Sequence, residues 1–129
     1  METPWDERLG FWWIARDHPD LPAIAASPDG TVLSYRDLAE RAHQLVHALR
    51  SRGLRSGDVV AYALPNGADI VCWQLALQEA GLAGVSLNPA LTGSEVRTVL
   101  DHSGAACVVV DHTYFDLPAL ADVAAPLRV

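Results

Sequence analysis

The sequence predicts an α/β fold, in which a parallel sheet is covered by helices on both faces and is preceded by an N-terminal helix and a small β-hairpin. Apolar runs at 59–64, 84–87 and 106–110 lack the alternation typical of strands with one solvated face. Helical patterns separate these runs, so strands and helices alternate along the chain. Strands of this kind need cover on both faces, and connections of helix length favour parallel pairing through right-handed crossovers.

The first third of the chain contains the elements that precede this sheet. Residues 9–13 are apolar and aromatic and predict a helix that ends before His18. Segments 23–26 and 31–33 flank a Ser-Pro-Asp-Gly turn, a composition typical of a hairpin. We therefore expect the hairpin to be separate from the parallel sheet.

Helix boundaries are marked by capping residues. Ser34 with Asp37, and Thr92 with Glu95, have the spacing of capping boxes at two helix starts. A glycine is expected to end each helix, at Gly53, Gly81 and Gly104. At the other end of the chain, 119–125 has a helical pattern, and Leu127 begins a further strand.

The turn after the first buried strand raises the question of a nucleotide site. The run ending at Leu64 is followed by Pro65, Asn66 and Gly67 and then at once by a helical pattern, as in phosphate-binding turns. Dinucleotide and phosphate loops require several glycines, and the latter a lysine, whereas Gly67 is the one glycine here. Asn66 is expected to cap the helix and satisfy its N–H groups. The turn is therefore interpreted as scaffold.

Composition excludes several function classes. The 129 residues suffice for one domain; they carry a net charge of −7, which disfavours nucleic-acid binding, and all nine basic residues are arginine. No apolar run reaches the roughly 20 residues of a membrane helix, and the N-terminus does not resemble a signal peptide. Cys72 and Cys107 lie in apolar segments, as expected of reduced thiols in a cytoplasmic protein.

No catalytic, cofactor-binding or metal-binding residue is predicted. His43 and His47 have the i, i+4 spacing of metal ligands, but no carboxylate or thiol completes a set, so surface histidines are the preferred interpretation. Ser86 and Ser103 lack patterned His and Asp partners. Without a lysine, no phosphate-loop or Schiff-base amine is available.

Taken in order, short motifs of this chain resemble the start of the adenylate-forming superfamily, which includes acyl-CoA synthetases, coumarate-type CoA ligases, luciferases and peptide-synthetase adenylation domains. The resemblance covers nearly the whole chain, and its Asn-Pro…Thr…Glu segment is most similar to acyl- and aryl-CoA ligases. The matching residues are His18–Asp20, Pro22–Ala23, Leu33–Leu38, Gly53, Gly57–Val60, Leu64–Asn66, Ala80–Gly81, Leu87–Pro89, Thr92, Glu95 and Asp101–Ala105.

The resemblance implies that residues 1–129 are part of an N-terminal AMP-binding domain that stops before the phosphate loop. ATP, Mg²⁺ and CoA would be used by the parent enzyme on a small carboxylic acid, while this part holds none of them. Its partners would be the remainder of the N-terminal domain and the C-terminal domain. The matched residues would be structural: Gly57 and Asp58 start a strand, Asn66 and the Thr92–Glu95 box begin helices, Asn88 and Pro89 turn the chain out of the preceding element, and Gly104 ends a helix.

Two other interpretations remain open. The chain could be a catalytically empty α/β module that binds a protein partner through the face its relatives use internally. It could also be an independent nucleotide-binding domain, against which the glycine count argues.

Overall fold

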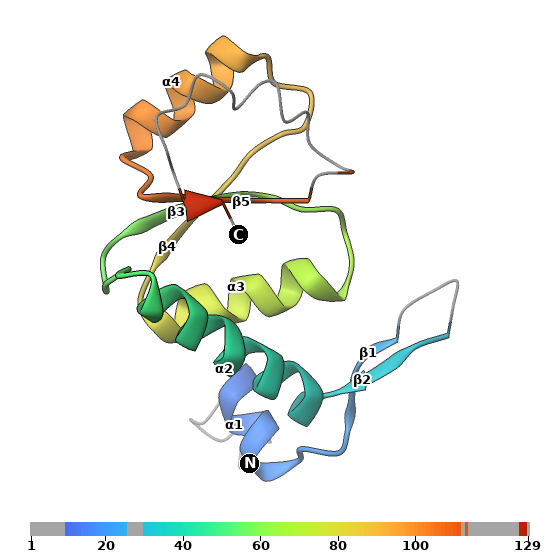
Figure 1. The fold of residues 1–129 in the computed structure, drawn as a ribbon. Helices are drawn as coiled ribbons and strands as arrows, with labels where there is room; N and C mark the ends of the chain where they lie inside the picture. Colours follow the sequence, from blue (N-terminus) through green and yellow to red (C-terminus); the bar gives the residue numbers. More distant parts are fainter. Residues whose placement is uncertain (1–9, 26–29, 112, 114–126, 129) are drawn as a thin grey trace, which may run out of the picture.

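The structure is a computed structural model that describes residues 10–25, 30–111, 113 and 127–128. Figure 1 shows the elements in chain order. They are α1 (Phe11–Asp17), β1 (Pro22–Ala25), β2 (Val32–Ser34), α2 (Tyr35–Ser51), β3 (Val59–Ala63), α3 (Ala68–Ala80), β4 (Ala83–Ser86), α4 (Gly93–Ser103), β5 (Cys107–Val110) and β6 (Leu127–Arg128).

The main sheet has the strand order β4-β3-β5-β6, and every pair in it is parallel. Val60 on β3 aligns with Gly84 on β4 and with Cys107 on β5. This confirms the predicted parallel strands and the further strand at Leu127. The helical pattern predicted at 119–125 lies outside the described residues.

Helices cover both faces of this sheet, as the uninterrupted apolar strands require. Figure 1 shows α2 and α3 on one face and α4 on the other. On the α2–α3 face, Val60, Tyr62 and Val109 belong to one buried cluster. On the α4 face, Ala61 and Val108 belong to a second. Alternate residues of β3 and of β5 therefore belong to two separate cores, one on each face of the sheet.

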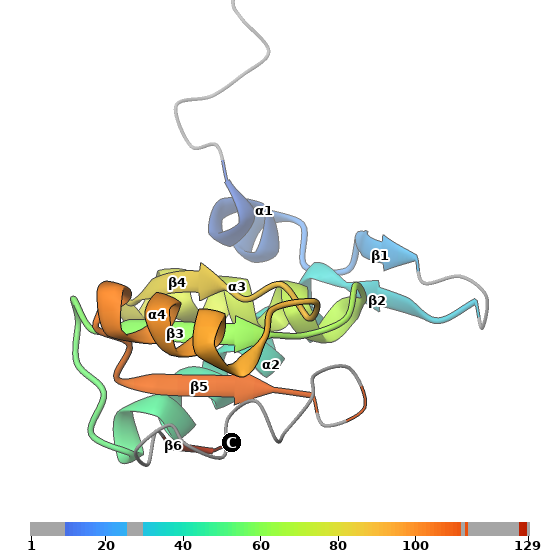
Figure 2. The same ribbon diagram turned by 90° about the horizontal axis from the view of Figure 1, so that it is seen from above.

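The N-terminal elements do not join the main sheet but contact α2, and Leu33 of β2 is part of the core that α2 and α3 form with the sheet (Figure 2). β1 and β2 pair antiparallel in a two-stranded sheet of their own, which confirms the predicted hairpin arms. The predicted opening helix corresponds to α1, although Leu9 and most of the hairpin turn lie outside the described residues. In the part of the chain that is described, no helix is long and apolar enough to cross a membrane.

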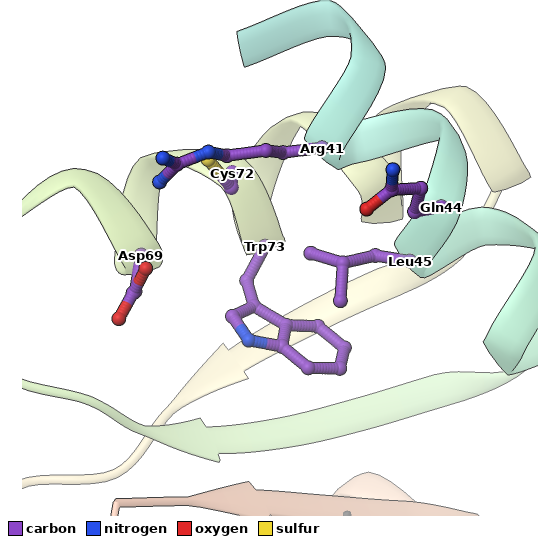
Figure 3. Close-up of a pocket in the computed structure, with 6 residues that line it drawn as sticks. All are labelled: Arg41, Gln44, Leu45, Asp69, Cys72 and Trp73. Atoms are coloured by element: carbon purple, nitrogen blue, oxygen red, sulfur yellow. The ribbon is translucent and has the colours of Figure 1, made fainter. Parts of the chain in front are cut away.

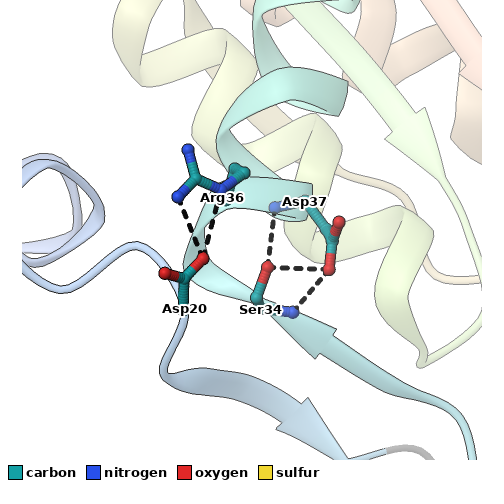
Figure 4. Close-up of polar contacts among 4 residues, drawn as sticks. All are labelled: Asp20, Ser34, Arg36 and Asp37. Atoms are coloured by element: carbon teal, nitrogen blue, oxygen red, sulfur yellow. Dashed lines mark hydrogen bonds and ion pairs between the residues drawn. The ribbon is translucent and has the colours of Figure 1, made fainter.

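A capping box fixes the junction between the hairpin and α2 (Figure 4). The Asp37 backbone N–H donates to Ser34 Oγ over 3.1 Å, and the Ser34 N–H donates to Asp37 Oδ2 over 2.8 Å. Hydrogen bonds to the Asp37 carboxylate from the Ser34 backbone N–H, and secondarily from the Ser34 hydroxyl, lower the pKa of this carboxyl. Beside the box, the Arg36 guanidinium donates to Asp20 over 2.9 Å.

Candidate functional site

The carboxyl ends of parallel strands are where α/β proteins most often bind ligands. At the end of β3, the structure corrects the sequence prediction. α3 begins at Ala68, so Gly67 occupies the N-cap position, and no side-chain hydrogen bond caps the helix. Asn66 lies one residue too early for its oxygen to reach the second or third N–H group of the helix. The expectation that Asn66 caps α3 is therefore wrong.

The electrostatics of this helix start nevertheless oppose a phosphate. Asp69 lies in the first turn of α3 and is exposed, so a carboxylate already complements the positive end of the helix. A phosphate placed there would face this negative charge, with no lysine in the chain to offset it. We therefore expect no phosphate at this helix start, and the interpretation of the turn as scaffold depends on Asp69 rather than on Asn66.

At the ends of β4 and β5, polar side chains are used in local turns. Asn88 Oδ1 accepts a hydrogen bond from the Ala90 N–H over 2.9 Å. Asp111 Oδ1 accepts from the Thr113 N–H over 2.7 Å and from the Thr113 hydroxyl over 2.5 Å. Both are side-chain turns in which the oxygen stabilises its own loop. The turn at Asn88 and Pro89 lies where the chain leaves β4.

The loop after β4 leads into the capping box of α4. The Thr92 backbone N–H donates to Glu95 Oε2 over 2.8 Å, and the Glu95 N–H donates to Thr92 Oγ1 over 3.5 Å. Val96, next in the chain, is fully buried, and Leu91 packs partly buried against the same cluster. The predicted capping box is therefore present and is joined to the core on the α4 face.

Replacement of Thr92 by Ala tests this box. We expect Thr92→Ala to lower the free energy of unfolding by about 0.5–2 kcal/mol, because it removes the oxygen that accepts from the helix backbone. Urea denaturation measures the change, and Thr98→Ala, on the exposed side of α4, serves as the control. An unchanged denaturation midpoint for Thr92→Ala would contradict a stabilising role for the box.

The same box predicts a pH dependence of stability. Hydrogen bonds from the Thr92 N–H, and secondarily from its hydroxyl, lower the pKa of the Glu95 carboxyl. A depressed carboxyl pKa contributes stability that is present above the unfolded-state pKa of about 4 and is lost as the pH falls through the folded-state value. At pH 7 we expect the wild-type chain to have a larger free energy of unfolding than Glu95→Gln. This difference should disappear as the pH is lowered below about 4. An advantage equally large at both pH values would contradict this.

Two further predicted structural positions lie at the opposite end of the sheet. Asp58 Oδ2 accepts from the Arg55 N–H over 2.7 Å, and the Gly57 N–H, at a residue with φ of 94°, donates to Gly81 O over 2.8 Å. The Ala83 N–H then donates to Asp58 O, where the β3–β4 ladder begins. At the end of α4, Gly104 has φ of 66°, and the following N–H donates to Leu100 O.

A pocket of about 200 Å³ lies between α2 and α3 (Figure 3). No sequence motif predicts this pocket, since its lining residues come from two different helices. Arg41 is its one cation, and the Asp69 carboxylate is also on its rim. The chemistry of the pocket is thus mixed, with no concentration of positive charge for an anion. It is lined by Arg41, Gln44, Leu45, Asp69, Cys72 and Trp73.

The surroundings of Cys72, Cys107 and His43 indicate structural roles for these three side chains. Burial raises the pKa of the Cys72 and Cys107 thiols, so both stay protonated and unreactive at neutral pH. His43 Nδ1 lies 2.7 Å from Glu79 Oε1, and the His43 ring stacks on Trp12 with 5.4 Å between the ring centroids. His43 on α2 therefore contacts both α3 and α1. Among the described residues, no group of three His, Cys, Asp or Glu side chains is placed to hold a metal ion.

Comparison with known proteins decides which family this scaffold represents. The profile described as "AMP-binding enzyme" matches residues 11–128. The chain belongs to the AMP-binding enzyme family. This result confirms the resemblance to adenylate-forming enzymes.

Similar proteins come from more than one branch of this AMP-binding family. Feruloyl-CoA synthase of an Amycolatopsis species is 34% identical over 93% of this chain and 24% of its own length. Surfactin synthase subunit 2 of Bacillus subtilis is 35% identical over 75% of this chain and 3% of its own. This AMP-binding chain therefore spans about a quarter or less of the length of these relatives.

The solved structures show the same fold. The o-succinylbenzoate CoA synthetase of Bacillus subtilis superimposes with a TM-score of 0.81 at 21% identity, covering 92% of this chain and 24% of that enzyme. The N-terminal subdomain of Klebsiella oxytoca NpsA superimposes with a TM-score of 0.72 at 29% identity, over 78% of this chain and 25% of that one. The fold of the AMP-binding family member described here is thus that of the first part of the adenylate-forming N-terminal domain.

Proposed function

We propose that this chain is the N-terminal part of an AMP-forming acid–thiol ligase of the acyl-CoA synthetase type. In that reaction a carboxylate oxygen attacks the α-phosphorus of ATP, giving an acyl-adenylate and pyrophosphate. The sulfur of CoA then attacks the acyl carbon, which forms a thioester and releases AMP. A magnesium ion would neutralise the phosphate charge.

The single observation that carries this proposal is the likeness to feruloyl-CoA synthase, which extends over 93% of the chain at 34% identity. A salicylyl-CoA synthase of a Streptomyces species is also 37% identical over 67% of the chain. Both names describe activation of an aromatic acid as its CoA thioester. We therefore favour a small apolar or aromatic carboxylic acid, in a cytoplasmic enzyme.

In this proposal the described residues contribute scaffold rather than chemistry. The capping boxes at Ser34 and Thr92 fix the starts of α2 and α4, and the turn at Gly57 and Asp58 fixes the start of β3. ATP, Mg²⁺ and CoA would be held by residues elsewhere in a longer polypeptide. We expect no catalytic residue in this part, and Asp69 in the first turn of α3 disfavours a phosphate at that helix start.

A second candidate function is amino-acid activation in a peptide synthetase. It is favoured by the 35% identity to surfactin synthase subunit 2 and by 30% identity to bacitracin synthase 3 of Bacillus licheniformis. The chemistry of the first step is the same. The acceptor would then be a carrier-protein thiol instead of CoA.

Pyrophosphate release distinguishes these functions. The longest in-frame product of the gene is assayed with ATP, Mg²⁺ and a panel of fatty, aromatic and amino acids, with and without CoA. CoA-dependent turnover on an apolar or aromatic acid supports the proposal, and turnover on amino acids alone supports the peptide-synthetase branch. Inactivity on every acid would contradict both and favour a catalytically empty interaction module.

A further inference from the structure

We propose that protonation of His43 strengthens the docking of α1 on α2, which makes the attachment of this helix sensitive to pH near neutrality. The inference does not depend on the proposed function. It is based on contacts among described residues of α1, α2 and α3, and none of these contacts involves an edge of the sheet.

The helix α1 needs tertiary contacts to stay in place. It has seven residues, whereas isolated helices shorter than about 12–15 residues are marginal in water. No side-chain hydrogen bond caps its start, and none of its residues is fully buried. Phe11 and Trp12 pack, partly buried, against the core cluster. The docking of α1 therefore depends strongly on the contacts that these two rings make.

Two rings of α2 contact these aromatic side chains. Phe11 lies tilted against Tyr35 with 5.5 Å between the ring centroids. Trp12 stacks on His43 at 5.4 Å, with an angle of 29° between the ring planes. A phenol ordinarily ionises near pH 10, whereas an imidazole does so near pH 6.5. Of these two contacts, it is therefore the stack on His43 that changes charge between about pH 5 and pH 8.

The imidazole also contacts a carboxylate of α3. His43 Nδ1 lies 2.7 Å from Glu79 Oε1, a length typical of a charge-assisted hydrogen bond. The other carboxylate oxygen, Glu79 Oε2, is buried and has no hydrogen-bond partner among the described residues. A carboxylate in this position gains more from a cation than from a neutral donor. The face of Trp12 likewise attracts a cation within about 6 Å of its centroid.

Other charged or titratable groups lie on the same elements, and each is exposed or lines a pocket. Arg16 and Asp17 form an ion pair with each other over 2.7 Å. Charges exposed to water interact weakly, so the two direct neighbours of the imidazole should dominate the effect of its protonation. The exposed groups are Arg16, Asp17 and His18 of α1 or its C-cap and Glu40 and His47 of α2, while Arg41 of α2 and Asp69 of α3 line the pocket between these helices.

Protonation of His43 should therefore stabilise the fold on the acidic side of neutrality. Because both neighbours bind the imidazolium more strongly than the neutral ring, the added stability is present below about pH 6.5 and is lost as the pH rises above it. The lowered pKa of the Asp37 and Glu95 carboxyls, and the raised pKa of the Cys72 and Cys107 thiols, keep these four groups from titrating in this range.

Urea denaturation of the 129-residue chain at about pH 5.5 and about pH 8.0 tests this proposal, because these values lie on either side of the ordinary imidazole pKa. His43→Gln keeps a hydrogen-bond donor for Glu79 but cannot become charged. We expect the ratio of the folding equilibrium constants, wild type to His43→Gln, to be about fivefold larger at the lower pH. An equal ratio at both pH values would overturn the proposal.

Trp12→Leu separates the contact with α1 from the pair with Glu79. In this background, the pH dependence of the His43→Gln effect should fall to about twofold, because the ring stack is absent. His18 is present in every variant, so its own titration cancels in the comparison. A pH dependence of full size in the Trp12→Leu background would show that the docking of α1 is not involved, and would overturn the proposal.

His47→Gln is the matched control, since it removes an exposed imidazole one helical turn further along α2. Its ratio to wild type should agree at the two pH values within about twofold. Circular dichroism confirms that each variant is folded before urea is added. A pH dependence confined to His43→Gln and reduced by Trp12→Leu supports the proposal, whereas one that is equally large for His47→Gln contradicts it.

Discussion

Leu49→Ala is expected to lower the free energy of unfolding by about 2–5 kcal/mol, among the largest effects of any single substitution in this chain. Leu49 is 1% exposed and belongs to the core between α2 and the sheet. Its backbone oxygen also accepts the Leu54 N–H over 3.2 Å where α2 ends. The substitution therefore leaves a cavity at a position whose backbone is held in place and cannot readily collapse.

Leu21→Ala is the matched control, because the same atoms are removed from a side chain that is 51% exposed. Its effect should be within about 1 kcal/mol. Urea denaturation at neutral pH measures both changes. Equal losses for Leu49→Ala and Leu21→Ala would contradict the core described here.

Gly81→Ala is the second substitution with a large expected effect. Gly81 ends α3 with φ of 71°, which costs an L-residue about 1–2 kcal/mol. A Cβ at this position would also lie 2.6 Å from Ser56 Oγ and 3.3 Å from Ser56 Cβ, so the Ser56 hydroxyl would have to rotate away and its Cβ would have to shift slightly. We expect a total loss of about 2–4 kcal/mol.

Gly104→Ala separates these two causes. Gly104 ends α4 with φ of 66°, close to that of Gly81, but no atom lies within 4 Å of its Cβ position. Gly104→Ala should therefore lower the free energy of unfolding only through the positive φ. The double substitution Gly81→Ala with Ser56→Ala should be more stable than Gly81→Ala alone, because the contact with the Ser56 hydroxyl is removed. If Gly81→Ala and Gly104→Ala have equal thermal midpoints, the contact with Ser56 is unimportant.

Local signals in the sequence predicted most of the fold. Ser34 with Asp37 and Thr92 with Glu95 act within one helical turn, so their spacing alone predicted the two capping boxes that the structure contains. The parallel strands were likewise predicted by their apolar residues, and β3 and β5 are buried as expected, whereas β4 is mostly exposed. The boundary at Asn66 was predicted wrongly, since a difference of one residue in a helix start decides whether a side chain can cap it.

Features that depend on tertiary structure were not predictable in this way. The pocket between α2 and α3 combines Arg41 with Cys72 and Asp69, and the His43–Glu79 contact joins residues 36 positions apart. The side chains of Leu77 on α3 and Tyr62 on β3 both lie close to the Cβ position of Gly84 on β4, a contact that also depends on tertiary structure. Periodicity and capping patterns carry no information on which helix faces meet.

We expect the 129-residue AMP-binding chain to provide scaffold and not to hold the nucleotide itself. Calorimetric titration with ATP and Mg²⁺ tests it most directly. No saturable binding is expected up to about 1 mM ATP, because the α3 N-terminus carries Asp69 and the chain has no lysine. Saturable binding that is lost in Gly67→Val or Asn66→Ala would contradict the account and make the turn after β3 a nucleotide site.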